Sequence, residues 1–342
     1  MSSYNTTVFI GRFQPFHLGH KRVIQEALKM SAQMVIIIGS TNRASDIKNP
    51  FSYKERRDMI INSLDPQDLA KVKIWGVEDR KYNEERWMAD IQEIVSKEVP
   101  ISNNIAVVGY KKDDSSYYID KFPQWEYLEI GPVYNELIDA TVIRHHWLNG
   151  QMAYTKGVLT DYVYKFLSTY KIAKLARELK VIEEGKKRWA GSPYEPIFTT
   201  TDAVVIQSGH ILMIKRRSAP GEGLLALPGG YLGPKEKIID SMLRELDEET
   251  GIKVPEKVLR GSIVASHIFD EPTRSLRGRI ITHAYKILLE DGPLPKLRVP
   301  KNETGTGEVS KAQWIPLNEL DKLRDQIFED HPDIIDYFTG RL

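Results

Sequence analysis

At 342 residues the chain is long for a single compact core, so its length predicts two domains. The formal net charge of +1 gives no sign of a nucleic-acid or membrane surface, and the absence of cysteine excludes disulfides, thiolate nucleophiles and cysteine-ligated zinc. No apolar stretch has the length of a membrane span, and the N-terminus lacks the pattern of a signal peptide, so we expect a cytoplasmic protein. These features leave the oligomeric state open.

The first segment of the chain predicts a strand, a helix and a second strand. Residues 6–11 form a short apolar run, and residues 19–32 follow with apolar side chains on one helical face. Residues 33–40, QMVIIIGS, are continuously apolar, as in a strand that is covered on both faces. Later apolar runs in KVKIWGV, NNIAVVGY and YLEIGP extend this βαβ unit to a Rossmann-like parallel sheet with an α/β fold.

The middle of the chain predicts the domain boundary. A helix is expected in ATVIRHHWLNG, with Asp139 or Thr141 as its cap, and residues 161–190 are rich in helical patterns. The following GSPYEP, residues 191–196, contains one glycine and two prolines and predicts a linker. We therefore expect a first domain over residues 1–190, which includes the helical segment, and a second domain over residues 197–342.

The second domain begins with a predicted hairpin, because two β runs in TTTDAVVIQSGHILMIKRR flank Ser208 and Gly209. An acidic helix in PKEKIIDSMLRELDEETG is expected to end at Gly251, which would serve as its C-cap. RGRIITHAYKILLE and KAQWIPL predict two later strands. This order of strands and helices predicts an α/β domain of a different type from the first.

The turn GRFQPFHLGH places two histidines at the entrance of the first helix. Unpaired N–H groups at a helix N-terminus attract phosphate, and His17 and His20 would face the same anion. Gly19 removes a side chain where a nucleotide needs to approach the backbone, and Arg12 adds a cation. Thr141 and Arg144 begin a later helix that can hold the other end of a triphosphate. The alternative is that both histidines are ordinary surface or capping residues.

The string GRFQPFHLGH resembles the signature of the nucleotidyltransferase superfamily. Together with GSTNRASDIKNPFSYKER and IDATVIR, it is similar to NMN adenylyltransferases of the archaeal type over about the first 170 residues. The resemblance implies that the NMN phosphate attacks the α-phosphorus of ATP and that pyrophosphate leaves, with Mg²⁺ and with His17, His20 and Arg144 as catalytic groups. It implies ATP binding by Gly11, Arg12, Phe13, His17, Gly19, His20, Thr141 and Arg144.

One cap position and one pair of candidate NMN-binding residues complete the motifs of the first domain. The family's late motif begins Ile-Ser, whereas this chain has Ile138 and Asp139, which leaves the role of Asp139 open. YNEERW matches the place where the family stacks an aromatic ring on nicotinamide, so the resemblance implies NMN binding by Trp87 and Asn83. The alternative is that Trp87 is a core residue of the amphipathic helix WMADIQEIV.

The second motif is GGYLGPKEKIIDSMLRELDEETGI, whose spacing from Gly230 to Ile252 is a complete Nudix box. Glu245 and Glu249 lie four residues apart on one helical face, and Glu248 lies at its edge. Such crowded oxygen ligands suit Mg²⁺ or Mn²⁺, and the flexible Gly230 lets a backbone carbonyl reach a metal. The metal would activate water for attack on phosphorus, with Glu245 as a catalytic ligand. The alternative is a solvated charged helix face.

Residues from about 197 to the end resemble Nudix hydrolases, which have an α/β/α sandwich fold and often take a general base from outside the box; Glu303 and Glu308 are candidates. FDEPTRSLRGRIITHAY resembles the segment of those Nudix hydrolases that act on ADP-ribose. This resemblance implies that Arg274, Arg277 and Arg279 bind phosphate or ribose, although arginines on a solvated surface would give the same pattern.

Both halves together are similar to the bacterial family that fuses an NMN adenylyltransferase to a Nudix hydrolase. The implied activities are NAD synthesis from NMN and ATP, and hydrolysis of ADP-ribose to AMP and ribose 5-phosphate. The implied partners are these small molecules, and the sequence shows no DNA-binding helix pair. Two alternatives remain: a related pair of enzymes with other nucleotide substrates, or a Nudix domain that senses ADP-ribose without cleaving it.

Overall fold

The computed structural model describes residues 3–99, 104–110, 114–131, 138–299 and 309–341. The chain forms two compact units, Met1–Ala176 and Arg177–Leu342. The division between them falls inside one helix, α7 (Ala173–Lys187). The predicted linker at residues 191–196 follows this helix, and its role as a functional boundary stays a prediction.

The first unit is built on a sheet of five parallel strands in the order β3-β2-β1-β4-β5. Their bounds are β1 (Tyr4–Gly11), β2 (Ser31–Ile38), β3 (Val72–Gly76), β4 (Ile105–Gly109) and β5 (Glu126–Glu129). The strand order reverses at β1, and sheets of this kind bind ligands at the carboxyl ends of the strands beside such a reversal. The prediction of a Rossmann-like parallel sheet is confirmed.

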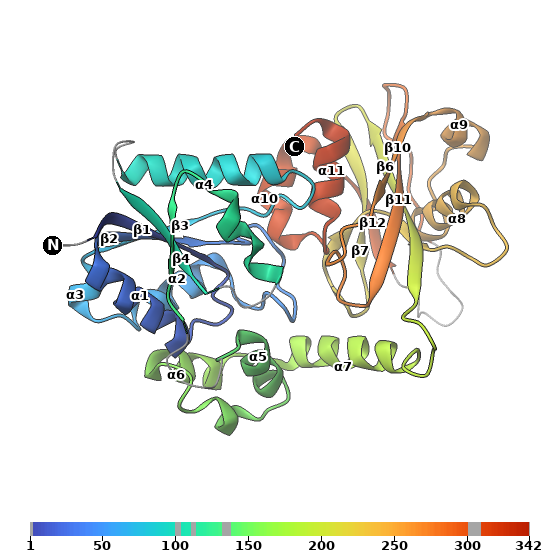
Figure 1. The fold of residues 1–342 in the computed structure, drawn as a ribbon. Helices are drawn as coiled ribbons and strands as arrows, with labels where there is room; N and C mark the ends of the chain where they lie inside the picture. Colours follow the sequence, from blue (N-terminus) through green and yellow to red (C-terminus); the bar gives the residue numbers. More distant parts are fainter. Residues whose placement is uncertain (1–2, 100–103, 111–113, 132–137, 300–308, 342) are drawn as a thin grey trace. The chain divides into compact units, whose positions relative to one another are not determined.

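Helices cover both faces of this sheet, as Figure 1 shows for α4 on one face and α1 and α2 on the other. Ile91 and Val95 of α4 pack on Val8 and Val35 of the sheet, which makes an apolar core on that face. The helical elements of the unit are α1 (Leu18–Met30), α2 (Tyr53–Ile61), α3 (Pro66–Leu69), α4 (Glu84–Glu98), the 3₁₀ turn η1 (Asp114–Lys121), α5 (Ala140–Leu148), the 3₁₀ turn η2 (Met152–Thr155) and α6 (Asp161–Thr169).

The second unit contains a mixed sheet in the order β10-β11-β6-β7-β12, with β8 paired to β7 and β9 paired to β6. β6 and β11 run parallel, and the other pairs are antiparallel. The bounds are β6 (Ile197–Gln207), β7 (His210–Arg216), β8 (Leu225–Ala226), β9 (Gly229–Tyr231), β10 (Ile263–Phe269), β11 (Arg279–Leu288) and β12 (Val309–Pro316). Ser208 and Gly209 both have positive φ at the predicted hairpin turn.

Two helices enclose the mixed sheet from opposite faces (Figure 1). α8 (Ile238–Thr250) buries Met242 and Leu246 against the sheet residue Val205, and it ends at the left-handed Gly251 as predicted. On the other face, Lys286 of β11 donates to the Phe338 carbonyl of α11 (His331–Thr339) at 2.7 Å. The remaining helical elements are α9 (Glu256–Gly261), η3 (Leu317–Glu319), α10 (Leu320–Leu323) and η4 (Arg324–Gln326). The predicted α/β/α sandwich is confirmed.

Among the described residues, no helix combines the length and the apolar character needed to cross a membrane.

A buried arginine connects the ends of β1 and β2 in the first unit. Arg56 is 1% exposed, and its guanidinium donates to the carbonyl oxygens of Arg12 (2.8 Å), Gly39 (2.6 Å) and Ser40 (3.0 Å). Burial lowers the pKa of this side chain to about 10, which leaves it charged at neutral pH. Since the three carbonyls follow the carboxyl ends of two neighbouring strands, Arg56 fixes the backbone at these strand ends.

We predict that Arg56→Met destabilises the first unit by about 3 kcal/mol, because several buried carbonyl oxygens lose their donor and each costs about 1–3 kcal/mol when unsatisfied. Urea unfolding measures this change. The exposed neighbour Arg57 provides the control, since Arg57→Met removes the same charge without these contacts. Equal stability of the two variants would contradict the assignment.

Candidate functional site

The two histidines of the first motif form one stacked pair at the start of α1. His17 is the N-cap; its Nδ1 accepts from the His20 N–H, and the His20 Nδ1 accepts from the His17 N–H, both at 3.3 Å. The ring centroids lie 3.6 Å apart. Burial, followed by the proximity of His17, holds the pKa of His20 well below its usual value. A neutral ring whose Nδ1 accepts carries its proton on Nε2, so His20 offers an N–H donor there.

The packing of this turn requires a residue without a side chain at position 19. An added Cβ would lie 3.0 Å from the ring of His17, so the glycine makes room for the stacked imidazole. Gly11 has a similar role, since its Cβ would lie 3.0 Å from the buried ring of Phe13. Phe13 itself has a positive φ of 52°. These residues therefore shape the turn, and their predicted contact with ATP stays a prediction.

Positive side chains converge on the same end of the sheet. Burial, with a contribution from the positive charges of Arg12 and Lys81, lowers the pKa of Lys48 to about 8. Burial lowers the pKa of Arg144 to about 10, again with a contribution from Arg12. Arg144 donates to the Gln14 carbonyl at 2.6 Å and to the Thr141 hydroxyl at 3.2 Å. Cations that disfavour one another's charge form a site that an anion stabilises.

Sequence reasoning did not single out Lys48, whose place depends on a contact between two loops. The Gln14 side chain donates to the Phe51 carbonyl at 2.9 Å and accepts from the Phe51 N–H at 3.0 Å. This pair holds the loop before α2 against the turn that carries the histidines. Lys48 thereby lies near Arg12, which contributes to its lowered pKa.

The structure gives Asp139 a local role. It is the N-cap of α5, and its Oδ1 accepts from the Thr141 N–H at 2.6 Å. Aspartate serves as well as serine in this position, since a side-chain oxygen is what an N-cap requires. The departure from the family motif therefore preserves the cap of the helix that carries Arg144.

Asn83 and Trp87 lie at the start of α4. Asn83 is its N-cap and accepts from the Arg86 N–H at 3.0 Å. Trp87 is partly buried, with its ring centroid 6.4 Å from that of Tyr118. The Tyr118 hydroxyl donates to the Ile10 carbonyl at 3.0 Å, so this aromatic pair extends to the end of β1. Trp87 thus has core contacts on the ligand side of the sheet, and nicotinamide stacking stays a prediction.

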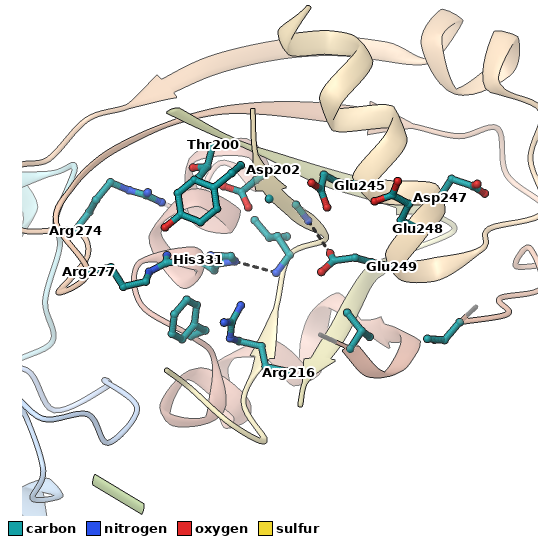
Figure 2. Close-up of a pocket in the computed structure, with 17 residues that line it drawn as sticks. Thr200, Asp202, Arg216, Glu245, Asp247, Glu248, Glu249, Arg274, Arg277 and His331 are labelled. Atoms are coloured by element: carbon teal, nitrogen blue, oxygen red, sulfur yellow. Dashed lines mark hydrogen bonds between the residues drawn. The ribbon is translucent and has the colours of Figure 1, made fainter. Parts of the chain in front are cut away.

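The second unit contains a cavity of about 750 Å³ with two chemically different walls. Figure 2 shows the carboxylates of α8 on one side and arginines on the other. Glu245, Glu248, Glu249 and Gly230 line the acidic wall, as the sequence predicts for the Nudix box. Such a cavity suits a ligand with a phosphate group and an uncharged or cationic neighbour.

Arg244 organises the acidic wall. Its guanidinium donates to Glu245 at 2.8 Å and to Glu248 at 2.9 Å, and the second contact is an i, i+4 pair on α8. A further bond at 2.8 Å reaches Glu236, and the hydrogen bond from Arg244 lowers the pKa of that carboxyl to about 2. Glu249 accepts from the Gly229 N–H at 2.8 Å.

The donor set of this wall fits a hard divalent cation. Three carboxylates and the backbone of Gly230 supply only oxygen, the ligand that Mg²⁺ and Mn²⁺ prefer. A Cβ on Gly230 would lie 2.5 Å from the Glu245 carboxyl carbon, so the glycine leaves the space that this carboxylate occupies. Within the described ranges no three acidic or histidine side chains form a tight ligand cluster. A cation would therefore have to draw these oxygens away from Arg244 and Gly229.

The arginine wall contains two of the three predicted arginines. Arg274 is 4% exposed and forms a double hydrogen bond with Asp330 at 2.8 and 2.9 Å. Arg277 donates to Glu329 at 3.0 Å. Arg279 instead donates to the Asp270 carbonyl and is absent from the described lining of the cavity. Its predicted role in ligand binding stays a prediction.

Further residues of the cavity come from segments that sequence reasoning did not connect with it. They include Arg216 at the end of β7, Phe328 before α11, and His331 at the start of α11. The His331 Nδ1 accepts from the Leu227 N–H at 2.9 Å, and burial lowers the pKa of this imidazole. The predicted general-base candidates Glu303 and Glu308 lie outside the described residues.

Comparison with known proteins assigns each unit to a class. Residues 8–127 match the family model described as Cytidylyltransferase-like, and residues 198–338 match the NUDIX domain. A Nicotinamide/nicotinic acid mononucleotide adenylyltransferase of Acinetobacter baylyi is 32% identical over 183 residues, which are 53% of this chain and 94% of that protein. The chain thus joins a nucleotidyltransferase unit to a NUDIX unit.

Two solved structures match nearly the full length of the chain. A bifunctional NMN adenylyltransferase/ADP ribose pyrophosphatase from Francisella tularensis is 35% identical, with a TM-score of 0.89 over 98% of this chain and 99% of that one. A second structure of such a protein from Francisella tularensis, complexed with AMP and Mn ion, is 34% identical with the same TM-score over 99% of each chain. The chain belongs to the family of bifunctional NMN adenylyltransferase/ADP ribose pyrophosphatases.

We predict that Gly230→Ala lowers hydrolase activity by on the order of 10²-fold, because the new Cβ displaces Glu245 and misplacement by about 1 Å has such an effect. Steady-state assays of both activities measure the change. Gly261→Ala serves as the control, since a Cβ there meets no described atom within 4 Å. If Gly230→Ala hydrolysed substrate at the parent rate, Glu245 would not belong to the reacting site.

Proposed function

We propose that the first unit transfers AMP from ATP to NMN, giving NAD and pyrophosphate, and that the second unit hydrolyses ADP-ribose to AMP and ribose 5-phosphate. For the transferase, the proximity of Lys48 and Arg144 to Arg12, beside the turn that carries the stacked histidines, carries the proposal. For the hydrolase, the cavity that joins an acidic wall to an arginine wall carries it. The family supplies the identity of both substrates.

The transferase needs no nucleophile from the protein, because an NMN phosphate oxygen forms the bond to the α-phosphorus of ATP as pyrophosphate leaves. The protein must hold both substrates in line and offset the negative charge that develops. Arg12, Lys48 and Arg144 offset this charge, and His20 offers its Nε2–H to a phosphate oxygen. Trp87 would stack on nicotinamide, with Asn83 beside the carboxamide. Gly11, Phe13, Gly19 and Thr141 shape the ATP-binding turns.

In the hydrolase, Glu245, Glu248, Glu249 and the Gly230 carbonyl would hold Mg²⁺ or Mn²⁺. The ion supplies Lewis-acid activation of water and neutralises the diphosphate. Arg244 orients the carboxylates of Glu245 and Glu248, because its guanidinium donates a hydrogen bond to each. Across the cavity from the acidic wall, Asp330 holds Arg274 in a fixed orientation. Arg277, on the same arginine wall, would supply a cation for phosphate or ribose.

We predict that the affinity for ATP depends on the charge of Lys48. With a pKa of about 8, this side chain is charged below that pH and neutral above it. The Michaelis constant for ATP should therefore rise between pH 7 and pH 9, by up to about tenfold as the charged fraction falls. Lys48→Arg keeps its charge throughout and should give a flat profile. If the parent and the variant had parallel profiles, Lys48 would not face the phosphates.

We further propose that residues 1–190 and 197–342 are separate catalytic domains, and Glu249→Gln tests this proposal together with the metal site. The substitution keeps the side-chain size and helix propensity but removes a negative ligand. ADP-ribose hydrolysis should fall by about 10²-fold or more, since metal activation of water depends on ligand charge. NAD synthesis should be unchanged, and circular dichroism should confirm folding.

Chromatography of the products formed from ATP and NMN, and separately from ADP-ribose, measures both activities of Glu249→Gln. Hydrolysis at the parent rate would refute the proposed metal site. Loss of both activities by the folded variant would refute the independence of the two domains.

A further inference from the structure

One histidine of the second unit lies almost fully buried in the wall of the cavity. His331 is 7% exposed and belongs to the lining residues. Its Nδ1 accepts from the Leu227 N–H at 2.9 Å, a bond that Figure 2 shows as a dashed line. Leu227 is 1% exposed, so its N–H is a buried donor that needs an acceptor. The contact therefore fixes the position of the ring and gives its Nδ1 the role of acceptor.

This hydrogen bond also determines where the imidazole carries its proton. Burial lowers the pKa of His331, although the carboxylates of Asp202 and Asp330 act in the opposite sense. A neutral ring whose Nδ1 accepts carries its proton on Nε2. Among the residues that the structure describes, none forms a hydrogen bond with this Nε2. The ring therefore offers a donor at Nε2, and it has no lone pair there with which to act as a general base.

The donor lies on the part of the wall that carries cations. The ring centroid of His331 lies 5.7 Å from that of Phe328, and the Arg277 guanidinium lies 5.5 Å from the same phenyl centroid. Arg274, which also lines the cavity, is close enough to disfavour a positive charge on His331. A neutral donor can bond to a phosphate oxygen without adding a charge that the arginines would repel. The wall thus combines cations with a neutral donor, an arrangement that suits a phosphate group.

We propose that His331 is a substrate-binding residue of the hydrolase, whose Nε2–H donates to a phosphate oxygen of a nucleoside diphosphate sugar in the cavity. The inference rests on the proposed hydrolase function. A phosphate oxygen only accepts hydrogen bonds, which matches a ring nitrogen that only donates. A histidine with a structural role alone would need its Nδ1 and not its Nε2–H. The two nitrogens therefore have separate roles that substitutions can distinguish.

The test compares His331→Asn and His331→Gln in the full chain. Asparagine places its Oδ1 near the position of Nδ1, so it keeps an acceptor for the Leu227 N–H and removes the Nε2–H. Glutamine places its amide near the position of Nε2, so it keeps a donor and leaves the Leu227 N–H without its acceptor. His210→Asn is the control, since His210 is not among the described lining residues and bonds to the Ser208 carbonyl.

Calorimetry without divalent metal should show about tenfold weaker binding of ADP-ribose to His331→Asn, the scale of one lost hydrogen bond. His331→Gln should bind within about threefold of the parent, and His210→Asn should equal it. Thermal unfolding should give the opposite order, with a lower Tm for His331→Gln than for His331→Asn. Parent-like affinity of His331→Asn together with weaker binding by His331→Gln would assign a structural role and overturn the inference.

Inorganic pyrophosphate serves as a second probe, because it carries phosphate without ribose. Its affinity should fall in His331→Asn by about the same factor as that of ADP-ribose. A loss confined to ADP-ribose would place the acceptor on a ribose and overturn the assignment to phosphate. NAD synthesis by the same samples should equal that of the parent.

Nuclear magnetic resonance of the parent protein with ¹⁵N-labelled histidine gives a result that does not depend on how a variant folds. The imidazole signal absent from a His331 variant should show a proton on Nε2, and ADP-ribose should shift it. A proton on Nδ1, or a signal that ADP-ribose leaves unchanged, would overturn the inference. If the parent bound ADP-ribose with these changes and failed to cleave it, the proposed hydrolysis would fail and the binding role would stand.

Discussion

Hydrogen bonds from arginine side chains to backbone carbonyl oxygens are the interactions on which both sites depend. A guanidinium needs a partner that fixes its orientation, and a backbone carbonyl oxygen meets this need. Arg144 bonds to Gln14 in the first unit, and Arg216 bonds to Pro220 in the second. Arg56 uses the same interaction to fix the strand ends beneath the first site. Each of these arginines donates a hydrogen bond to a loop carbonyl, so the position of the loop and the position of the positive charge depend on each other.

The parts of the fold and the sites that depend on local spacing could be predicted from the sequence. The histidine pair at the start of α1 and the acidic face of α8 lie within single turns of helix, so chain spacing already determines their geometry. The parallel sheet followed from apolar runs that alternate with helical patterns. The hairpin at Ser208 and Gly209 and the end of α8 at Gly251 followed from residues that accept positive φ.

The remaining site residues could not be predicted, because their proximity arises from tertiary contacts. Lys48 lies near Arg12 because the Gln14–Phe51 bonds hold their two loops together, and Arg216 meets Phe328 across more than a hundred residues of sequence. β10 and α11 were also missed, since GSIVASHIF and HPDIIDYF lack a clear period: β10 is largely exposed, and α11 buries its aspartates together with its isoleucines. Arg279 was predicted together with Arg274 and Arg277, which line the cavity, but Arg279 itself donates to the Asp270 carbonyl.

The central claim is that one chain carries out two phosphorus reactions that differ in the attacking oxygen: an NMN phosphate in the first unit and water in the second. Mass spectrometry of products formed in ¹⁸O-labelled water tests this claim most directly. NAD made from ATP and NMN should contain no ¹⁸O, because water takes no part in the transfer. AMP and ribose 5-phosphate made from ADP-ribose should together gain one ¹⁸O per bond cleaved. Labelled NAD, or cleavage products without label, would contradict the account.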